Sequence, residues 1–209
     1  MRTIQKGPEP PTLTQHRKQP HADYDNYPDK EALRIALVAE QRGLCCYCQS
    51  RIWPSPEHMK IEHWQCQDAH PDRQLDFSNL HGACLGGEGR PPCEQHCDTR
   101  KGNNLLCFKV CDSTRPIENK IHFKGDGRIS SDDAAIEHDI NRVLNLNLAR
   151  LVSNRKAVLT AFQKRLAMSQ RFDPARELMK WDGRQTGELE PFAQVVVYYL
   201  RKRQARAGR

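Results

Sequence analysis

The sequence predicts an α+β protein, with a cysteine-rich middle of short strands and a mainly helical C-terminal region. Two observations support this division. Residues 44–104 crowd cysteines, histidines and glycines together with little hydrophobic periodicity, whereas the residues beyond 130 place apolar side chains at helical spacing. The length of 209 residues suits one full domain with an attached module.

Three segments are expected along the chain. Residues 1–28 are rich in proline and poor in apolar side chains, which predicts an extended arm. Residues 29–130 form the cysteine-rich module, and residues 131–209 form the helical region with a basic C-terminal end. Because residues 44–104 hold too little apolar content for a core of their own, we expect a metal ion to organise them.

The module is expected to begin with a helix after Pro28, with Asp29 as its N-cap and Gly43 as its stop. An alternating strand follows at residues 60–64, and Asn79 lies on a second strand. The remaining elements are a short helical stretch closed by Gly102 and a hairpin in which residues 121–123 and 128–129 flank a turn.

The helical region should begin with a capping box formed by Ser130 and Asp133. The next helix carries an apolar stripe from Leu151 to Leu166. Asp173-Pro174 and Glu190-Pro191 predict the starts of the last two helices. The final helix ends in the basic cluster at residues 201–206, which is either a solvated helix end or a phosphate contact.

Composition narrows the location and the partners of the protein. No run approaches the ~18 apolar residues of a membrane-spanning helix, and the N-terminal stretch lacks the apolar segment of a secretory signal. We therefore expect a cytoplasmic protein without membrane contact. The 33 Lys and Arg against 26 Asp and Glu leave a net charge of +7, which favours a polyanionic partner.

Nine cysteines in a chain without a secretion signal indicate metal binding rather than disulfides. Cys45-x-x-Cys48 has the spacing with which two thiolates grip one tetrahedral zinc ion, and a second pair must complete the site. Candidates for that pair are Cys84, Cys93 and Cys97. A redox role for Cys45-x-x-Cys48 would need a βαβ context, which the sequence lacks.

The order of the motifs resembles the HNH endonucleases, the zinc-stapled ββα-metal nucleases. That order is Cys45-x-x-Cys48, Glu62-His63, Asn79-Leu80, Cys84 and Cys97-Asp98-x-x-Lys101. Three flanking motifs are similar to the HNH proteins grouped with PtuB: Met1-Arg2-x-Ile4-x-Lys6, residues 40–48 and Leu144-Asn145-Leu146-Asn147. PtuB is the nuclease of Septu anti-phage systems and of some retrons, and its partner is an ABC-type ATPase.

This resemblance implies a role for each site residue. His63 is the general base, and Asn79 holds the loop and the imidazole. Glu62 and Asp98 would bind Mg²⁺ or Mn²⁺, because two carboxylates with waters make a hard, oxygen-rich site. The structural zinc would be held by Cys45, Cys48, Cys84 and Cys97, and a substrate phosphate would be clamped by Arg100 and Lys101.

Two departures from the HNH pattern matter. Asp98 stands where many HNH motifs have His or Asn, which argues against Zn²⁺ or Ni²⁺ as the catalytic ion. Residues 85–96 stand where the HNH pattern has a two-residue spacer. This longer segment leaves it undecided whether Cys84 or Cys93 is the fourth zinc ligand. Cys84 preserves the positional match, whereas Cys93 would share a helix face with Cys97; we favour Cys84.

The resemblance predicts a metal-dependent HNH endonuclease that is the effector of an anti-phage complex. DNA is the favoured substrate, and RNA such as tRNA is the alternative. Residues 131–209 are expected to dock an ABC-type ATPase, and a retron RNA–DNA component is a further expected partner. The competing hypothesis is a zinc-knuckle module that binds nucleic acid or protein without cleaving it.

Overall fold

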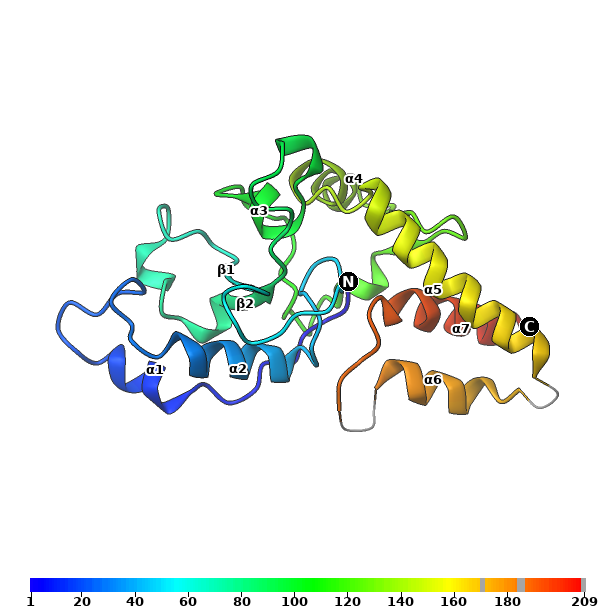
Figure 1. Cartoon of the computed structure of the whole chain (residues 1–209), viewed down its shortest axis with the longest axis horizontal. Coiled ribbons are helices and arrows are strands. Elements are labelled where there is room, and N and C mark those ends of the chain that lie inside the picture. The colour runs from blue at the N-terminus through cyan, green and yellow to red at the C-terminus, as the bar shows by residue number, and fades with distance from the viewer. Residues whose placement is uncertain (170–171, 184–186, 208–209) are drawn as a thin grey trace.

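The structure is an α+β fold in which two small sheets are surrounded by helices and long connections, as the sequence predicts (Figure 1). It is a computed structural model that describes residues 1–169, 172–183 and 187–207. The cysteine-rich middle lies between an N-terminal part that carries α1 and α2 and a C-terminal layer formed by α5, α6 and α7 (Figure 1).

The proline-rich segment is not wholly extended, because it contains the helix α1 (Pro11–His16). The next helix, α2 (Lys30–Glu40), has the predicted N-cap: the carboxylate of Asp29 accepts a hydrogen bond from the backbone N–H of Ala32. Gly43 follows the end of α2 with φ 78°. Leu13 and Tyr27 of the proline-rich segment are fully buried in a cluster with two leucines of α2 and with Leu75, Phe77 and Leu80.

Two antiparallel strands follow, β1 (Lys60–His63) and β2 (Leu80–Ala83). Their register pairs Glu62 with His81 and His63 with Leu80. The sequence predicts Asn79 on the second strand, but it lies just before β2, at the end of a 3₁₀ turn. The 3₁₀ turns of this region are η1 (Pro71–Arg73), η2 (Phe77–Asn79), η3 (Pro92–Glu94) and η4 (Ile117–Asn119). The predicted short helix is α3 (Cys97–Lys101), and Gly102 closes it with φ 51°.

The predicted hairpin consists of β3 (His122–Phe123) and β4 (Ile129–Ser130). The capping box predicted from Ser130 is wrong, because Ser130 belongs to β4. The N-cap is Asp133, whose carboxylate accepts hydrogen bonds from the first turn of the next helix. That helix, α4 (Ala134–His138), continues as the π-helix η5 (Asp139–Val143) and is followed by α5 (Ala149–Met168).

The last helices are α6 (Pro174–Asp182) and α7 (Ala193–Ala207). Asp173 caps α6 as predicted, since its carboxylate accepts from two backbone N–H groups. Glu190-Pro191 does not start α7 as Asp173-Pro174 starts α6. Phe192 takes a positive φ of 59° after it, and the helix begins at Ala193.

One hydrophobic cluster joins all three predicted segments. It runs from Met1 and Ile4 through the thiols of the cysteine-rich middle to Leu151 of α5 and Phe192. A second cluster packs α5 against α7 through Leu159, Phe162 and Leu200. The segment boundaries at residues 28 and 130 stay predictions, but the side chains on either side of them share a core. Among the described residues, no helix is long and apolar enough to cross a membrane.

Candidate metal centre and active site

Four cysteine thiols meet in the middle of the molecule. The Sγ atoms of Cys45, Cys48, Cys84 and Cys97 all lie within 4.8 Å of one another. Cys45 and Cys97 are 3.9 Å apart, and Cys48 and Cys84 are 3.6 Å apart. Tetrahedral zinc sites with Zn–S distances of about 2.3 Å place their sulfurs at such separations. The cluster can therefore hold a zinc ion.

The backbone brings these thiols together from three places. Cys45 and Cys48 lie in a loop after α2 that is closed by a β-bridge between Leu44 and Arg51. Cys84 directly follows β2, and Cys97 is the first residue of α3. Cys93, the rejected alternative, is exposed and stands outside the cluster.

His96 borders the thiol cluster without belonging to it. Its Nδ1 atom lies 3.1 Å from Sγ of Cys97 and 4.0 Å from Sγ of Cys84, and the side chain is buried. A ring N–H at this place can donate to a thiolate and so support a negatively charged cluster. Four thiolates around zinc leave no open position for a reacting water, so the fit is to a structural ion.

The second group of the site is a carboxyl pair beneath α3. Glu62 of β1 is 1% exposed and has the Asp98 carboxyl of α3 as a neighbour. Its Oε1 atom accepts from the Tyr47 hydroxyl at 2.7 Å and is 2.9 Å from Nζ of Lys101. Burial, with the neighbouring Asp98 carboxyl, raises the pKa of Glu62 well above its ordinary value.

The two predicted phosphate clamps lie in different surroundings. Lys101 does not face solvent: it is 1% exposed, and its ammonium binds Glu62 and the backbone carbonyl of His63. This placement contradicts a substrate contact, because the charge of Lys101 is needed to neutralise a buried carboxylate. Arg100 is exposed, and its guanidinium donates to the backbone carbonyl of Pro92 at 3.1 Å. It stays available to a phosphate.

His63 is nearly buried at the end of β1, with 7% of its surface exposed. Its Nε2 lies 3.0 Å from the backbone carbonyl of Gln74, and its Nδ1 lies 3.4 Å from the amide nitrogen of Gln67. The Tyr24 ring stands edge-on to the imidazole, with ring centroids 4.6 Å apart. Burial lowers the pKa of His63, so the ring is neutral near pH 7.

Asn79 is completely buried, and its side chain forms hydrogen bonds that hold the loop between β1 and β2 in place. Its Oδ1 accepts from the backbone N–H of Gln65 at 2.8 Å, and its Nδ2 donates to the carbonyls of Gln65 and Arg73. The loop-holding role predicted for Asn79 agrees with these bonds. The imidazole is oriented by other groups, since His63 bonds to Gln67 and Gln74.

Sequence reasoning missed the roles of Tyr47 and Tyr24. Tyr47 sits inside the C-x-x-C motif, where an aromatic residue carries no signal for a carboxylate contact. Tyr24 belongs to the proline-rich segment, far from His63 in sequence. His81 on β2 pairs in register with Glu62, is 0% exposed, and has no hydrogen-bond partner for either ring nitrogen among the described residues.

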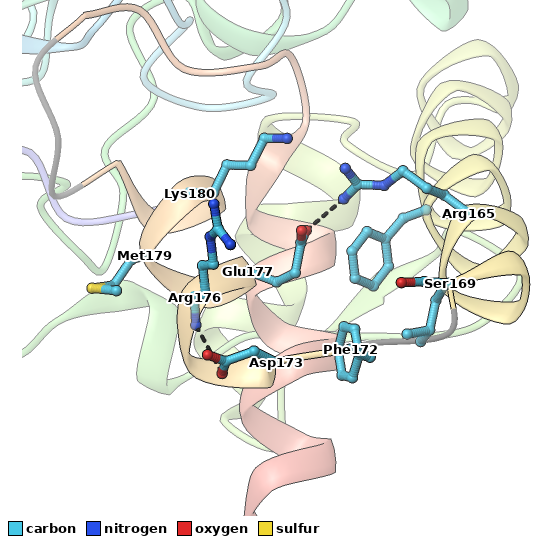
Figure 2. Close-up of a pocket in the computed structure, with 10 residues that line it drawn as sticks. Arg165, Ser169, Phe172, Asp173, Arg176, Glu177, Met179 and Lys180 are labelled. Carbon is cyan, nitrogen blue, oxygen red and sulfur yellow. Dashed lines mark hydrogen bonds and ion pairs between the residues drawn. The ribbon is translucent and has the colours of Figure 1, made fainter.

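A large cavity lies apart from these residues, between the end of α5 and α6 (Figure 2). Its volume is about 910 Å³, and the Arg165–Glu177 ion pair crosses it. Phe172 also lines it, and Asp173 accepts from the backbone of Arg176 at its edge (Figure 2). None of the predicted catalytic or metal-binding residues lines this cavity.

The fold and the site together define an α+β protein with a four-thiol cluster beside a buried carboxyl pair. No protein-family model matches the chain. Among curated proteins, the chain is similar to the Septu protein PtuB of Bacillus thuringiensis, with 23% identity over 100 residues. The matched part is 44% of this chain and 38% of that protein, so the chain spans well under half the length of its curated relative. The similarity supports a distant relationship to this Septu protein.

The thiol cluster predicts one zinc ion per chain. Cys45→Ser or Cys84→Ser should abolish zinc binding and leave the protein insoluble or unfolded, because the loop, β2 and α3 lose their common anchor. Cys93→Ser should be harmless, since Cys93 is exposed and outside the cluster. Elemental analysis of purified protein measures the zinc. Soluble, folded wild-type protein without zinc would refute the assignment.

The buried ion pair predicts unequal effects at two adjacent positions. Lys101→Ala should lower the free energy of unfolding by about 3 kcal/mol, since it leaves Glu62 buried without its cation. Arg100→Ala should change it by less than about 0.5 kcal/mol, because the side chain is exposed. Chemical denaturation of both variants measures the difference. Equal stabilities would show that Lys101 does not neutralise Glu62.

Proposed function

We propose that the protein is a metal-dependent HNH-type endonuclease with a structural zinc, and that it acts in a Septu-like anti-phage complex. The observation that carries the proposal is the buried Glu62–Asp98 pair beside Lys101, on a strand–strand–helix unit anchored by four thiols, with His63 at the next position of β1. The similarity to a Septu protein is independent support for the same proposal.

The hydrogen bonds of His63 fix which nitrogen can act as a base. A backbone carbonyl can only accept, so the contact with Gln74 places the proton on Nε2. Nδ1 then carries the lone pair, and its neighbour is the amide nitrogen of Gln67 at 3.4 Å. A water that takes the place of this weak contact would lose its proton to Nδ1 and attack the phosphorus atom.

The carboxyl pair has the chemistry of a magnesium or manganese site. Among the described residues, the cysteines alone bring three or more metal-ligating side chains together, so Glu62 and Asp98 offer just two carboxylates. That number suits Mg²⁺, which is held by one or two carboxylates with waters and substrate phosphate oxygens completing its shell. Such an ion would neutralise the leaving 3′-oxygen. Asp98 is only partly buried, so it is the member of the pair that a substrate phosphate could approach.

The residues around the pair divide the remaining tasks. Asn79 holds the loop that carries Gln67 and Gln74, and Arg100 is the exposed cation that can reach a phosphate. A zinc-knuckle binding module has no use for a buried carboxyl pair or for a neutral imidazole fixed in one tautomer. These groups favour hydrolysis over simple binding, with DNA as the favoured substrate and RNA as the alternative.

Cleavage by the purified protein, or by the protein with its partner, tests the proposal. His63→Ala should reduce the rate of nucleic-acid cleavage by about 10²–10⁴-fold, because the attacking water loses its base. Zinc content and solubility should not change. His58→Ala is the matched control, since His58 is exposed and distant from the carboxyl pair in its contacts. Cleavage at the wild-type rate by His63→Ala would favour the binding module.

The metal ion is tested through Asp98. Asp98→Ala should also lose cleavage in Mg²⁺, but additional Mn²⁺ should restore part of it, since weakened metal affinity can be offset by concentration. His63→Ala should not respond to Mn²⁺, because a missing base is not replaced by more metal. Identical responses of the two variants would contradict the separate roles.

We also propose that the helical region docks an ABC-type ATPase. Met168 at the end of α5 is 86% exposed and Met179 of α6 is 45% exposed, so both offer flexible apolar side chains of the helical region to a partner. Met168→Asp with Met179→Asp should reduce co-purification with the ATPase, whereas Ile35→Asp on α2, 52% exposed, should not. Unchanged co-purification of the double variant with the ATPase would show that the interface lies elsewhere on the protein.

A further inference from the structure

A cavity of about 350 Å³ lies where the last turns of α7 meet α5 and the β3–β4 turn. Three aromatic side chains line it, Phe123, Tyr198 and Tyr199. Three cations also line it, Lys202, Arg203 and Arg206, and all three are exposed. No acidic side chain is among its lining residues in the part of the chain that the structure describes.

The charge of this cavity differs from that of its neighbours. The larger cavity beside α6 has its Arg165 neutralised by Glu177, and Arg201, one residue before the cation group, pairs with Asp182 at 3.1 Å. Within the described ranges, no ion pair involves the three cations of the smaller cavity. Two of them lie near rings instead: Lys202 is 5.8 Å from the centre of the Tyr198 ring, and Arg203 is 5.3 Å from that of Phe172.

We propose that this cavity binds a single-stranded segment of nucleic acid. One base stacks on the tyrosine rings, and the adjoining phosphates lie on Lys202, Arg203 and Arg206. Aromatic faces accept any base, and a row of cations follows the backbone; this is the usual construction of sequence-tolerant single-strand sites. A duplex keeps its base faces covered, so it could use the cations but not the rings.

The site is separate from the proposed hydrolytic centre. The C-terminal end of α7 lies at the opposite side of the molecule from β1 and β2 (Figure 1). The cavity would thus hold a second portion of a strand or an independent nucleic acid, and binding there needs neither His63 nor the carboxyl pair. Single-strand binding at this cavity and cleavage at the hydrolytic centre can therefore be tested independently of each other.

The turn before β4 offers a sharp test. A Cβ added at Gly125 would meet no atom within 4 Å, and Gly125 lines the cavity. Gly125→Glu therefore brings a negative charge to the cations without a steric clash, and Gly125→Gln is its neutral match. Gly125→Glu should weaken the binding of a labelled 12-nucleotide single strand at least tenfold, whereas Gly125→Gln should bind like the parent protein.

The experiment uses the full chain carrying His63→Ala, so that labelled DNA and RNA strands are not cut, and measures fluorescence anisotropy over a range of salt. Replacing Lys202, Arg203 and Arg206 by Ala should reduce the salt slope by about 2, since single strands contribute ~0.7 per phosphate contact. Replacing the exposed cations Lys18, Lys120 and Arg142 removes equal charge elsewhere and should leave the slope close to its original value.

The rings are tested apart from the charges. Tyr198→Leu should weaken single-strand binding by about 5- to 100-fold, whereas Tyr198→Phe keeps the ring and should restore it. Equal affinity for a duplex, or single-strand binding that is unchanged by both Gly125→Glu and the triple cation variant, would overturn the proposal. So would the absence of any single-strand binding.

Discussion

The position of α3 depends on the thiol cluster, and the candidate site depends on α3. A helix of five residues has almost no stability of its own, because nucleation is unfavourable and few intrahelical bonds repay it. Cys97 also takes a φ of 55°, which costs a residue other than glycine about 1–2 kcal/mol. This backbone persists because the thiol is fixed among three others and the Cys97 N–H donates to the carbonyl of Leu144.

Once α3 is fixed, its other side chains follow. Asp98 and Lys101 are one and four residues after Cys97, so anchoring that thiol sets both against Glu62 on β1. The helical region braces the same element from the other side, since Asn145 donates to the carbonyls of Cys93 and Gln95 just before α3. The thiol cluster, the carboxyl pair and the helical region are therefore mechanically one unit, which explains why a single core crosses the expected boundaries.

Features set by neighbouring residues could be predicted from the sequence. The N-caps Asp29 and Asp173 depend on contacts within three residues, and the spacing of Cys45 and Cys48 is a property of one loop. The choice of Cys84 over Cys93 needed the resemblance to the HNH proteins. The spacing alone does not show how residues 85–96 fold back, and that path decides which of the two thiols lies beside Cys45 and Cys48.

The burial of Lys101 could not be predicted from the sequence. A lysine in a last helical turn normally faces water, and Lys101 is buried because it pairs with Glu62, which is far away in sequence. The ring contact between Tyr24 and His63 could not be predicted either, because these two residues are far apart in sequence.

The cations near the proposed hydrolytic centre are largely committed to the protein itself. Lys101 neutralises Glu62, Lys6 pairs with Glu40, and Arg73 pairs with Asp76. Affinity for nucleic acid comes mainly from cations that can exchange counterions for phosphates, so a centre with its charges engaged internally is poorly equipped to retain a strand. The cations Lys202, Arg203 and Arg206 of α7, which form no ion pair within the described part of the chain, would meet that need. If both proposals hold, a strand would be held at the end of α7 and cut beside β1, and the hydrophobic clusters between these parts would keep them in one geometry.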